Sequence, residues 1–438
     1  VILLMPGCTA KLRERLERGR RNAGLVIVDD AILTRMVLAE REQRRAIGIL
    51  RSIMINAQNA ANTEVFRVEK AVEPRTGIFV GREDLIRQVV DGTNNVALYG
   101  GRRIGKSSIL SVAHDRLAQR EHVQIVQHSF EGGRSVWHDD AVAKEIARQL
   151  GLDGVVDLQS LAVALHEQLD SDPDLRVVLL FDEIDRYIKS TQTRHLLIET
   201  LRALSDRHGD RLRIVVAGFM SLYDCLSGRG PYSGADDPWG RMFHDTGPVP
   251  NLKPEHAEEI VREGFWEVLG WHFESSMIPQ LIVERTGGHP DFVQHFCSKL
   301  QERVAARGDQ TVRREDVKAV FFDDDPSYSF VAHVRKTLKM NLDPVAHLLI
   351  LLIADRARES RRLTFEQFAE VARLSRVEIP RQIIEESLRR LQVTSVVNET
   401  KANMYEFAVP DYPLILSRLE ETRHVAELED EVEEVLRA

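Results

Sequence analysis

Residues 96–109 read Val-Ala-Leu-Tyr-Gly-Gly-Arg-Arg-Ile-Gly-Lys-Ser-Ser-Ile and set the architecture of the chain. The first four residues are an apolar run, which predicts a buried strand. Gly100 and Gly105 then bracket four residues, and Lys106 and Ser107 follow. This is the pattern G-x-x-x-x-G-K-[ST], with a helix expected over 107–117 behind it. A chance glycine turn would not require a strand before it and a helix after it, so the stretch predicts a phosphate-binding loop.

Each residue type in this loop has a task in phosphate binding. Glycine lets the backbone come close to the phosphates and take a positive φ without strain. The loop N–H groups and the N-terminus of the following helix face the anion. We predict that Lys106 reaches the β- and γ-phosphates and that the Ser107 hydroxyl binds Mg²⁺. The loop residues predicted to contact the nucleotide are Gly100, Arg103, Gly105, Lys106, Ser107 and Ser108.

A second apolar run ends in two carboxylates. Residues 176–185 read Arg-Val-Val-Leu-Leu-Phe-Asp-Glu-Ile-Asp. An uninterrupted apolar run is typical of a strand in a parallel sheet, and ligands bind such sheets at the carboxyl ends of the strands. We predict that Asp182 holds Mg²⁺ through water, and that Glu183 is catalytic, together with Lys106, by orienting or deprotonating the attacking water. Asp185 is predicted to cap the helix that follows.

The composition is that of an ordinary globular protein. The 438 residues are 43% hydrophobic and 29% charged, and the net charge of −9 excludes a nucleic-acid footprint over the whole chain. Cys8, Cys225 and Cys297 lie far apart, so we expect free thiols in a reducing, cytoplasmic compartment. No apolar run approaches the length of a membrane span. The start at Val1, without Met or a signal peptide, indicates a segment cut from a longer protein.

Residues 1–75 have the pattern of the last part of an α/β domain. Strands are predicted at 1–5 and 25–28, with a basic helix at 11–21 between them and a long helix at 31–60 after them. Asp29 and Asp30 follow the second strand. They form either a nuclease or metal site or the N-cap of the long helix, and the cap is favoured because no second acidic cluster lies nearby.

Three further strands are predicted, at 123–130, 213–217 and 245–252. Residues 228–242 are rich in Gly, Pro and Asp and predict a long exposed loop. Arg229 and Arg241 in this loop are either arginine fingers or solvated side chains. Arg229 is interpreted as solvated, and for Arg241 both interpretations stay open.

Beyond residue 253 the pattern becomes helical, with helices predicted at 254–269 and 276–285. Gly287 and Gly288 end one helix, and Pro290 begins the next, where its missing N–H costs nothing. The segment is either a plain turn between helices or part of a lid in which His289 or Pro290 contacts the nucleotide.

Residues 343–418 predict a winged helix. Helices are expected at 343–355, 365–372 and 379–391, and strands at 393–397 and 404–409 around a hairpin at 398–403. The third helix of this fold can contact DNA, but here three arginines are offset by three glutamates, so any DNA binding is expected to be weak. These residues are Arg381, Arg389, Arg390, Glu378, Glu385 and Glu386. The acidic tail after Leu419 is either a partner helix or a helix laid on its own domain.

These motifs, in this order, resemble the STAND class of P-loop ATPases, which is close to the AAA+ superfamily, over about residues 78–415. Gly100–Ser107 matches Walker A and Leu179–Asp185 matches Walker B. Phe79–Glu83 resembles the motif whose backbone contacts adenine in that class, and Gly288–Pro290 resembles its GxP motif, whose proline packs on adenine. The resemblance implies that the nucleotide is also bound by Val80, Gly81, Arg82, His289 and Pro290.

The same resemblance implies a domain order. It consists of the end of an N-terminal α/β domain with a linker helix at 1–75, a parallel-sheet P-loop core of the ASCE/AAA+ type at 76–252, an α-helical lid at 253–340, a winged-helix domain at 341–418 and an acidic helical tail at 419–438. The sequence departs from the class after Ala217, where Phe219 and Met220 replace a polar γ-phosphate sensor, and at His289, where a sensor arginine is missing.

The function implied is a switch that binds ATP or ADP with Mg²⁺ and hydrolyses ATP slowly. A protein partner or effector would act through the N-terminal segment or the tail, a nucleotide-dependent oligomer is possible in this class, and no membrane is involved. One alternative is an initiator or remodelling ATPase that works on DNA as a ring. The other is a scaffold that traps ADP without hydrolysing ATP.

Overall fold

The structure is a computed structural model that describes residues 2–4, 26–28, 65–66, 68, 78–131, 137–190, 195–230, 237–323, 325, 328–360, 362–417 and 422–437. The chain divides into two compact units. The first comprises Val1–Lys70, Gly77–Val80 and Lys253–Arg335, and the second comprises Ala71–Thr76, Gly81–Leu252 and Lys336–Ala438.

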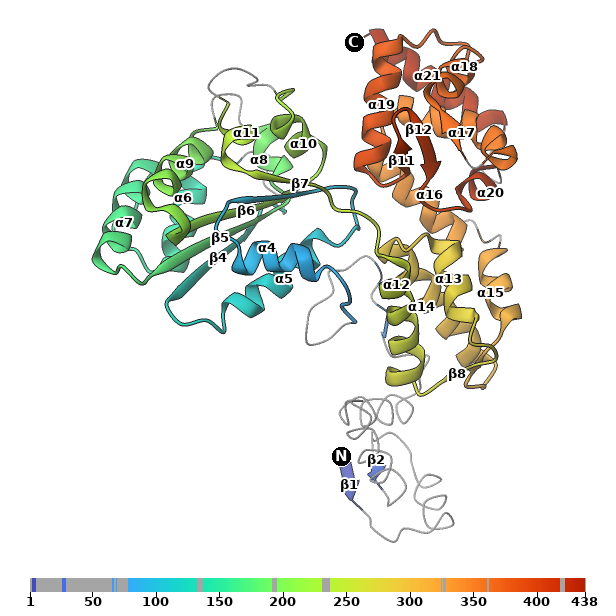
Figure 1. Ribbon diagram of the computed structural model, residues 1–438, viewed down its shortest axis with the longest axis horizontal. Coiled ribbons are helices and arrows are strands. Elements are labelled where there is room, and N and C mark those ends of the chain that lie inside the picture. The colour runs from blue at the N-terminus through green and yellow to red at the C-terminus, as the bar shows by residue number, and fades with distance from the viewer. Residues whose placement is uncertain are drawn as a thin grey trace. The chain divides into compact units, whose positions relative to one another are not determined.

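A five-stranded parallel sheet forms the centre of the second unit (Figure 1). Its strand order is β4-β5-β6-β3-β7, so the strand of the glycine loop lies between β6 and β7. The strands are β3 Val96–Tyr99, β4 Val123–Ser129, β5 Arg176–Asp182, β6 Leu212–Gly218 and β7 His244–Pro248. The α/β fold with a parallel sheet predicted from the sequence is confirmed.

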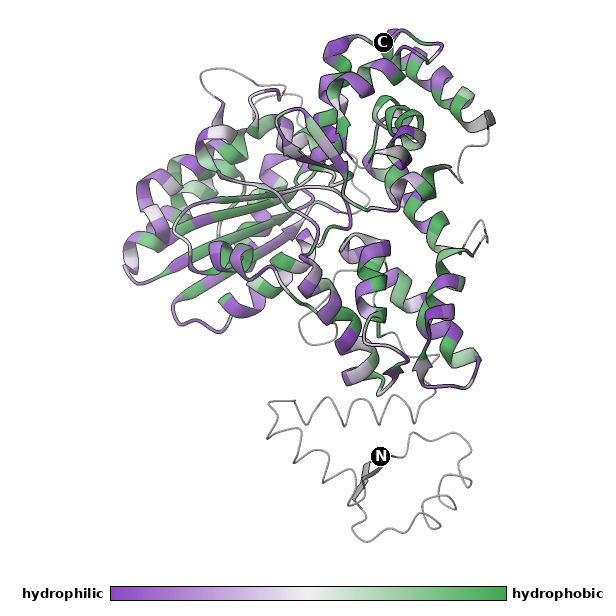
Figure 2. Ribbon diagram, turned by 45° about the vertical axis from the view of Figure 1, so that its right-hand side comes forward, coloured by the Kyte–Doolittle hydropathy of each residue, from purple (hydrophilic) through white to green (hydrophobic). Residues whose placement is uncertain are grey.

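Helices cover both faces of this sheet, as its continuous apolar strands predict. Figure 1 shows α4 Glu83–Asp91 and α5 Lys106–Leu117 on one face, and α6 Asp139–Leu150, α7 Leu158–Ser171 and α9 Leu196–His208 on the other. Figure 2 shows hydrophobic residues along the strands and mixed character along the helices, which each bury one side.

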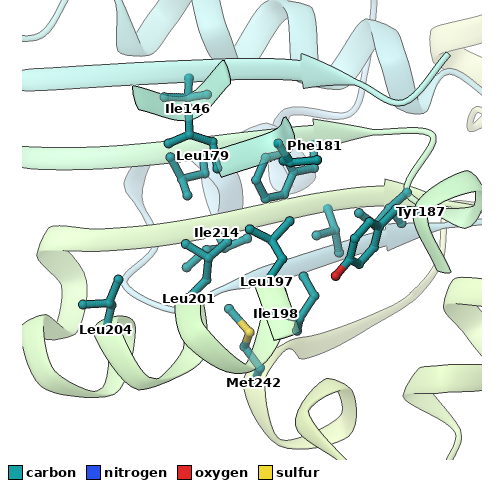
Figure 3. Packing of buried hydrophobic residues seen from close by; sticks show 14 of the residues in the cluster. Ile146, Leu179, Phe181, Tyr187, Leu197, Ile198, Leu201, Leu204, Ile214 and Met242 are labelled. Atoms are coloured by element: carbon teal, nitrogen blue, oxygen red, sulfur yellow. The ribbon is translucent and has the colours of Figure 1, made fainter. Parts of the chain in front are cut away.

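The larger hydrophobic layer lies between the sheet and α6, α7 and α9. Figure 3 shows Leu179 of β5 and Ile214 of β6 beside Leu201 of α9, and all three side chains are fully buried. Each such side chain contributes about 1.5–3 kcal/mol by leaving water. This layer fixes β5 and β6, and therefore the carboxylates at the carboxyl end of β5.

Short helices complete this half of the second unit. They are α8 Asp185–Ser190, the 3₁₀ turn Gly209–Arg211, α10 Met220–Leu226 and α11 Pro238–Met242. The indole N–H of Trp239 in α11 donates to Nδ1 of His195 at 2.6 Å, and both side chains are buried. This bond fixes α11 to the start of α9.

The helical part of the first unit contains α12 Pro254–Arg262, the π-helix Glu263–Val268, α13 Ile278–Thr286, α14 Pro290–Ala306, α15 Arg314–Phe321 and the first half of α16 Phe330–Asn341. Strands β8 His272–Phe273 and β9 Thr311–Val312 pair in parallel. The helix predicted at 254–269 is observed, but its second half, Glu263–Val268, is a π-helix. There the ring of Phe66 lies against Gly264, and a Cβ at Gly264 would come within 2.3 Å of it.

The C-terminal part of the second unit contains helices and a small antiparallel sheet in the order β10-β12-β11. Its elements are α17 Pro344–Glu359, β10 Leu363–Thr364, α18 Phe365–Ala372, α19 Arg381–Val393, β11 Val397–Lys401, β12 Met404–Phe407 and α20 Tyr412–Ser417. This is the order of elements expected for a winged helix, and that classification stays a prediction.

The predicted boundaries of the hairpin are wrong. Residues 393–397 were expected as a strand, but α19 ends at Val393 and β11 begins at Val397. Only Val397 is buried in β11, so its exposed polar residues resemble a loop in the sequence. The turn itself is Ala402-Asn403, with Asn403 at φ +60°.

The tail forms helix α21 Thr422–Arg437 and lies on its own domain. Leu428 and Val432 are buried, and the Glu429 carboxylate accepts a hydrogen bond from Arg376 Nε at 2.6 Å. Of the two interpretations drawn from the sequence, the helix laid on its own domain is the one observed.

At the N-terminus, β1 Ile2–Leu4 pairs in parallel with β2 Val26–Val28, as two strands of an α/β domain would. The helices predicted at 11–21 and 31–60 and the pair Asp29-Asp30 lie outside the described residues. Within the ranges given above, none of the helices has the length and apolarity needed to traverse a bilayer. Cys225 and Cys297 are buried free thiols, as expected, and Cys8 lies outside the described residues.

Candidate nucleotide-binding site

The glycine loop between β3 and α5 has the backbone conformation that its sequence predicts. Gly100 has φ +148° and Gly105 has φ +100°, in the region that favours glycine. A Cβ at Gly100 would lie 3.3 Å from the backbone of Val249, which follows β7. The helix starts at Lys106, with Gly105 as its N-cap, so the N-terminus of α5 opens directly onto the loop.

Lys106 is folded into the loop. Its side chain is buried, and its ammonium donates to the carbonyl oxygens of Gly100 at 2.9 Å and of Gly101 at 2.8 Å. Burial lowers the pKa of Lys106, and the carboxylates of Glu183 and Asp182 oppose this shift. A buried ammonium at the centre of a phosphate-binding loop gains most from an anionic ligand, because the ligand compensates its lost hydration.

The structure brings together the two residues predicted to hold Mg²⁺. The Ser107 side chain hydrogen-bonds to the carboxylate of Asp182, which ends β5. Burial raises the pKa of Asp182, whereas this hydrogen bond and the charge of Lys106 lower it. One hydroxyl and one carboxylate next to a phosphate site are the oxygen ligands that Mg²⁺ takes, so the residues fit the ion.

Glu183 follows with φ +54°, a conformation that is uncommon outside glycine. Its backbone N–H donates to Asp182 Oδ1 at 2.9 Å. Burial raises the pKa of the Glu183 carboxyl, and Asp182 raises it further. A carboxylate with a raised pKa is a better proton acceptor, which suits the predicted role in activating water.

The prediction for Asp185 is wrong. Its buried carboxylate caps α10, not the helix α8 in which it lies, because it accepts hydrogen bonds from the backbone N–H groups of Phe219 and of Ser221, the latter at 2.7 Å. The contact needs a glycine at 218, where a Cβ would lie 2.6 Å from Asp185 Oδ2. Asp185 therefore ties the strand of Asp182 and Glu183 to the segment after β6.

That segment begins with Phe219, at the position that a polar γ-phosphate sensor occupies in the class that the sequence resembles. The guanidinium carbon of Arg102, in the glycine loop, lies 5.8 Å from the centre of the Phe219 ring. Arg229 lies over the ring of Tyr223 at 5.0 Å and is exposed, in agreement with its interpretation as solvated. Arg241 is exposed on α11, and both of its interpretations stay open.

The residues before α4 support the loop from the other side. Gly81 and Arg82 both have positive φ, at +72° and +69°. Arg82 Nη2 donates to the carbonyl oxygens of Pro250 at 2.6 Å and of Ile104 at 3.3 Å, and burial lowers the pKa of Arg82 to about 10. Arg82 thus links the glycine loop to the segment after β7. Adenine binding by Val80, Gly81 and Arg82 stays a prediction.

The C-terminal part of the second unit contacts the glycine loop, and sequence reasoning missed these residues. The backbone N–H of Arg102 donates to Asn341 Oδ1 at 2.6 Å, and Arg103 Nη1 donates to Thr337 Oγ1 at 3.2 Å. A Cβ at Gly101 would lie 2.9 Å from the carbonyl oxygen of Thr394. Arg103, predicted to contact the nucleotide, therefore points its guanidinium at α16 instead, and its role at the nucleotide stays a prediction.

The segment 287–290 has the turn geometry expected from the sequence. Gly287 and Gly288 have φ +58° and +67°, and Pro290 begins α14. His289 is buried and stacks on Phe292 with 4.2 Å between ring centres. The contact of His289 and Pro290 with a nucleotide stays a prediction.

Three potential metal ligands, His166, Asp170 and His208, lie together on α7 and α9. Arg211 Nη2 lies 3.2 Å from His208 Nδ1, and a guanidinium can only donate, so Nδ1 accepts and Nε2 carries the proton. That proton is donated to His166 Nδ1 at 2.9 Å, which leaves the His166 Nε2 proton facing Asp170 at 3.4 Å. The three side chains thus form a chain of hydrogen bonds in which each ring nitrogen has a partner. The positive charge of Arg211 beside them opposes the binding of a metal ion.

The arginines of α19 form ion pairs. Arg390 Nη1 lies 2.6 Å from Asp343, Arg381 Nε lies 3.3 Å from Glu385, and Arg389 Nη2 lies 3.9 Å from Glu385. Charges that are neutralised in this way add little to phosphate binding.

The comparisons with known proteins agree with this geometry. Residues 89–226 match the sequence family described as an AAA domain, and no curated protein matches the chain. The Walker-type ATPase of Pyrococcus abyssi is similar with 15% identity and a TM-score of 0.56, over 80% of this chain and 99% of that one.

Two further similar structures have lower TM-scores. The ORC2 protein of Aeropyrum pernix matches with 12% identity and a TM-score of 0.49, over 82% of this chain and 96% of that one. The RuvB Holliday junction branch migration motor of Thermotoga maritima matches with 14% identity and a TM-score of 0.38, over 75% and 92%. The family match over residues 89–226, the loop and the sheet together support an α/β P-loop core like that of an AAA domain.

Proposed function

We propose that this chain is a nucleotide-driven switch that binds ATP with Mg²⁺, hydrolyses it slowly and reports the nucleotide state through its C-terminal domain. This is the behaviour expected of the STAND class. The observation that carries the proposal is the seating of Asn341 and Thr394 on the glycine loop. A C-terminal domain that contacts the phosphate-binding loop senses what the loop holds.

The coupling follows from differential affinity. Arg102 N–H is bound by Asn341, and Lys106 is bound by the loop carbonyls of Gly100 and Gly101. Phosphates that draw Lys106 away from these carbonyls would alter the loop against which Asn341 and Thr394 pack. A ligand shifts a conformational equilibrium by as much as it prefers one state over the other. ATP and ADP differ at the γ-phosphate, so they would favour different positions of the C-terminal domain.

The chemistry would be carried out by the residues around the loop. Lys106 would bind the phosphates, Ser107 and Asp182 would hold Mg²⁺, and Glu183 would accept a proton from the attacking water. The magnesium ion, when bound, neutralises charge on the phosphates. Slow turnover is proposed because Phe219 occupies the position at which a polar side chain would help to align the γ-phosphate.

Two alternative functions are distinguished from the switch by experiment. A DNA-associated initiator or remodeller is less favoured, because Arg381, Arg389 and Arg390 are engaged in ion pairs. Tight DNA binding at about 150 mM salt with a steep salt dependence would revive it. A scaffold that traps ADP would release no phosphate.

Partners are proposed on the same basis. The apolar residues Leu428 and Val432 of the tail are buried on their own domain. We therefore propose that a protein partner or effector acts through the N-terminal segment and not through the tail. We also propose that the chain forms a nucleotide-dependent oligomer.

The proposal is tested by measuring phosphate release together with domain position. The purified chain is incubated with Mg²⁺ and ATP, and small-angle scattering is recorded with ADP and with a non-hydrolysable ATP analogue. The proposal predicts slow phosphate release and different scattering profiles for the two nucleotides. Release of no phosphate would leave the ADP scaffold, and identical profiles would rule out the switch.

A further inference from the structure

The glycine loop contains two adjacent arginines whose side chains have different surroundings. Arg103 Nη1 donates to Thr337 Oγ1 at 3.2 Å, so its guanidinium is directed at α16. Arg102 is exposed, and its guanidinium carbon lies 5.8 Å from the centre of the Phe219 ring, just past the carboxyl end of β6. The side chain of Arg103 therefore contacts the C-terminal domain, whereas that of Arg102 lies at the sensor position occupied by Phe219.

The surroundings of Arg102 place its guanidinium on the reactive side of the site. Arg102 lies in the same loop as the carbonyl oxygens of Gly100 and Gly101, which bind the ammonium of Lys106. Its guanidinium lies over Phe219, whose backbone N–H is bound by Asp185, two residues after Glu183. The Arg102 side chain therefore extends from the phosphate-binding loop towards the segment that carries the predicted water-activating carboxylate.

The backbone of Arg102 is fixed by the protein. Its N–H donates to Asn341 Oδ1 at 2.6 Å, and Asn341 Nδ2 in turn donates to the Thr337 carbonyl at 3.0 Å. The backbone that carries the Phe219 ring is fixed as well, because the Phe219 N–H is bound by the buried carboxylate of Asp185. A cation over an aromatic ring is held by about 0.5–1 kcal/mol at an exposed site, so it can turn towards a stronger anionic partner.

We propose that Arg102 is a catalytic residue that contacts the γ-phosphate of ATP from within the same chain and compensates for the apolar Phe219 at the sensor position. This inference rests on the proposed ATPase function. It assigns to the glycine loop the polar contact with the γ-phosphate that Phe219 cannot make. A planar guanidinium can bind two phosphate oxygens at once, which suits the three equatorial oxygens of the transferred group.

The reaction can be written with Arg102 in place. The oxygen of water attacks the γ-phosphorus while Glu183 takes up its proton, and the bond from the γ-phosphorus to the bridging oxygen of ADP breaks. The electron pair of that bond leaves with ADP, and the products are ADP and inorganic phosphate. Negative charge on the γ-phosphoryl oxygens is what Arg102 would stabilise, and arginines in this role increase the rate by orders of magnitude in other P-loop proteins.

The test compares Arg102→Ala and Arg102→Lys with wild type in the full chain. Single-turnover ATP hydrolysis gives the rate, and calorimetry gives the affinities for ATP and ADP with Mg²⁺. We expect Arg102→Ala to reduce the hydrolysis rate about tenfold or more and to weaken ATP binding relative to ADP, because only ATP has the γ-phosphate. Arg102→Lys restores part of the rate, since it keeps a point charge without the bidentate geometry.

Arg116→Ala is the matched control. Arg116 is in the same helix as Lys106, but it pairs at the surface with Glu83 at 2.8 Å, so its removal leaves the rate and both affinities unchanged. Wild-type hydrolysis by Arg102→Ala, or an equal loss of ATP and ADP affinity, would overturn the assignment while leaving the ATPase function intact. A wild-type protein that binds neither nucleotide would overturn both.

Discussion

Asn341 accepts a hydrogen bond from the backbone N–H of Arg102 at 2.6 Å, and so joins helix α16 to the middle of the phosphate-binding loop. Thr337, one turn earlier in the same helix, accepts a hydrogen bond from the side chain of Arg103 at 3.2 Å. Two neighbouring loop residues are thus held by one helix, and this helix leads into the C-terminal domain. A ligand that changes the conformation of the loop would therefore also change the contacts between the loop and that domain.

Asn341→Ala should loosen this connection. A neutral hydrogen bond contributes about 0.5–1.5 kcal/mol, so we expect faster hydrogen exchange at the loop amides by roughly two- to tenfold. Exchange measured by mass spectrometry over residues 101–105 checks this, and Asn398→Ala on the exposed hairpin strand is the control. Equal exchange in both variants would show that the contact does not hold the loop.

Glu183→Gln should retain ATP but stop turnover. The amide keeps the size of the side chain and cannot accept a proton from water, and general bases contribute about 10²- to 10⁴-fold. Phosphate release should therefore fall by at least about 100-fold, while calorimetry shows ATP affinity close to that of the wild type. Release at the wild-type rate would mean that another group activates water.

The lid prediction rests on Pro290, which begins α14 after two glycines with positive φ. A rigid apolar ring can cover adenine without losing side-chain entropy. Pro290→Ala should weaken nucleotide binding only modestly and reduce the compaction caused by ADP in small-angle scattering. If ADP compacts neither protein, or compacts both equally, then residues 287–290 are only a turn.

Much of the fold could be predicted because its signals are local. The apolar runs of β3, β5 and β6 and the glycine pattern at 100–105 each define their element without a partner. Asp182 and Ser107 could be assigned to one site because parallel strands and the loop meet at the same edge of the sheet.

Other features depend on contacts between distant residues. Asn341 and Thr394 have no sequence signal that points to the loop, and Asp185 caps α10 only because β5 and β6 are neighbours. β11 is almost wholly polar because only Val397 faces the domain, so an alternating or apolar pattern is missing. The π-helix at 263–268 arises where Phe66 packs on Gly264, far away in the chain.

Acidification should destabilise the second unit through His208. Burial lowers the pKa of this histidine, with Arg211 acting in the same direction and Asp170 opposing it. The unfolded chain then binds the proton at a higher pH than the folded one, so stability is lost as pH falls below about 6.5. Urea unfolding of wild type and His208→Gln at pH 7.5 and 5.5 should show a smaller loss in the variant, and an equal loss would assign the effect to other groups.

The central claim is that the loop at 100–107 binds a nucleotide through the buried ammonium of Lys106. Calorimetric titration with ATP and Mg²⁺, on wild type and on Lys106→Ala, measures this directly. A charge-assisted hydrogen bond contributes about 1.5–3 kcal/mol, so the variant should lose roughly 10- to 100-fold in affinity while its unfolding curve shows a largely intact fold. Equal affinity in the two proteins, or no binding by the wild type, would contradict the account.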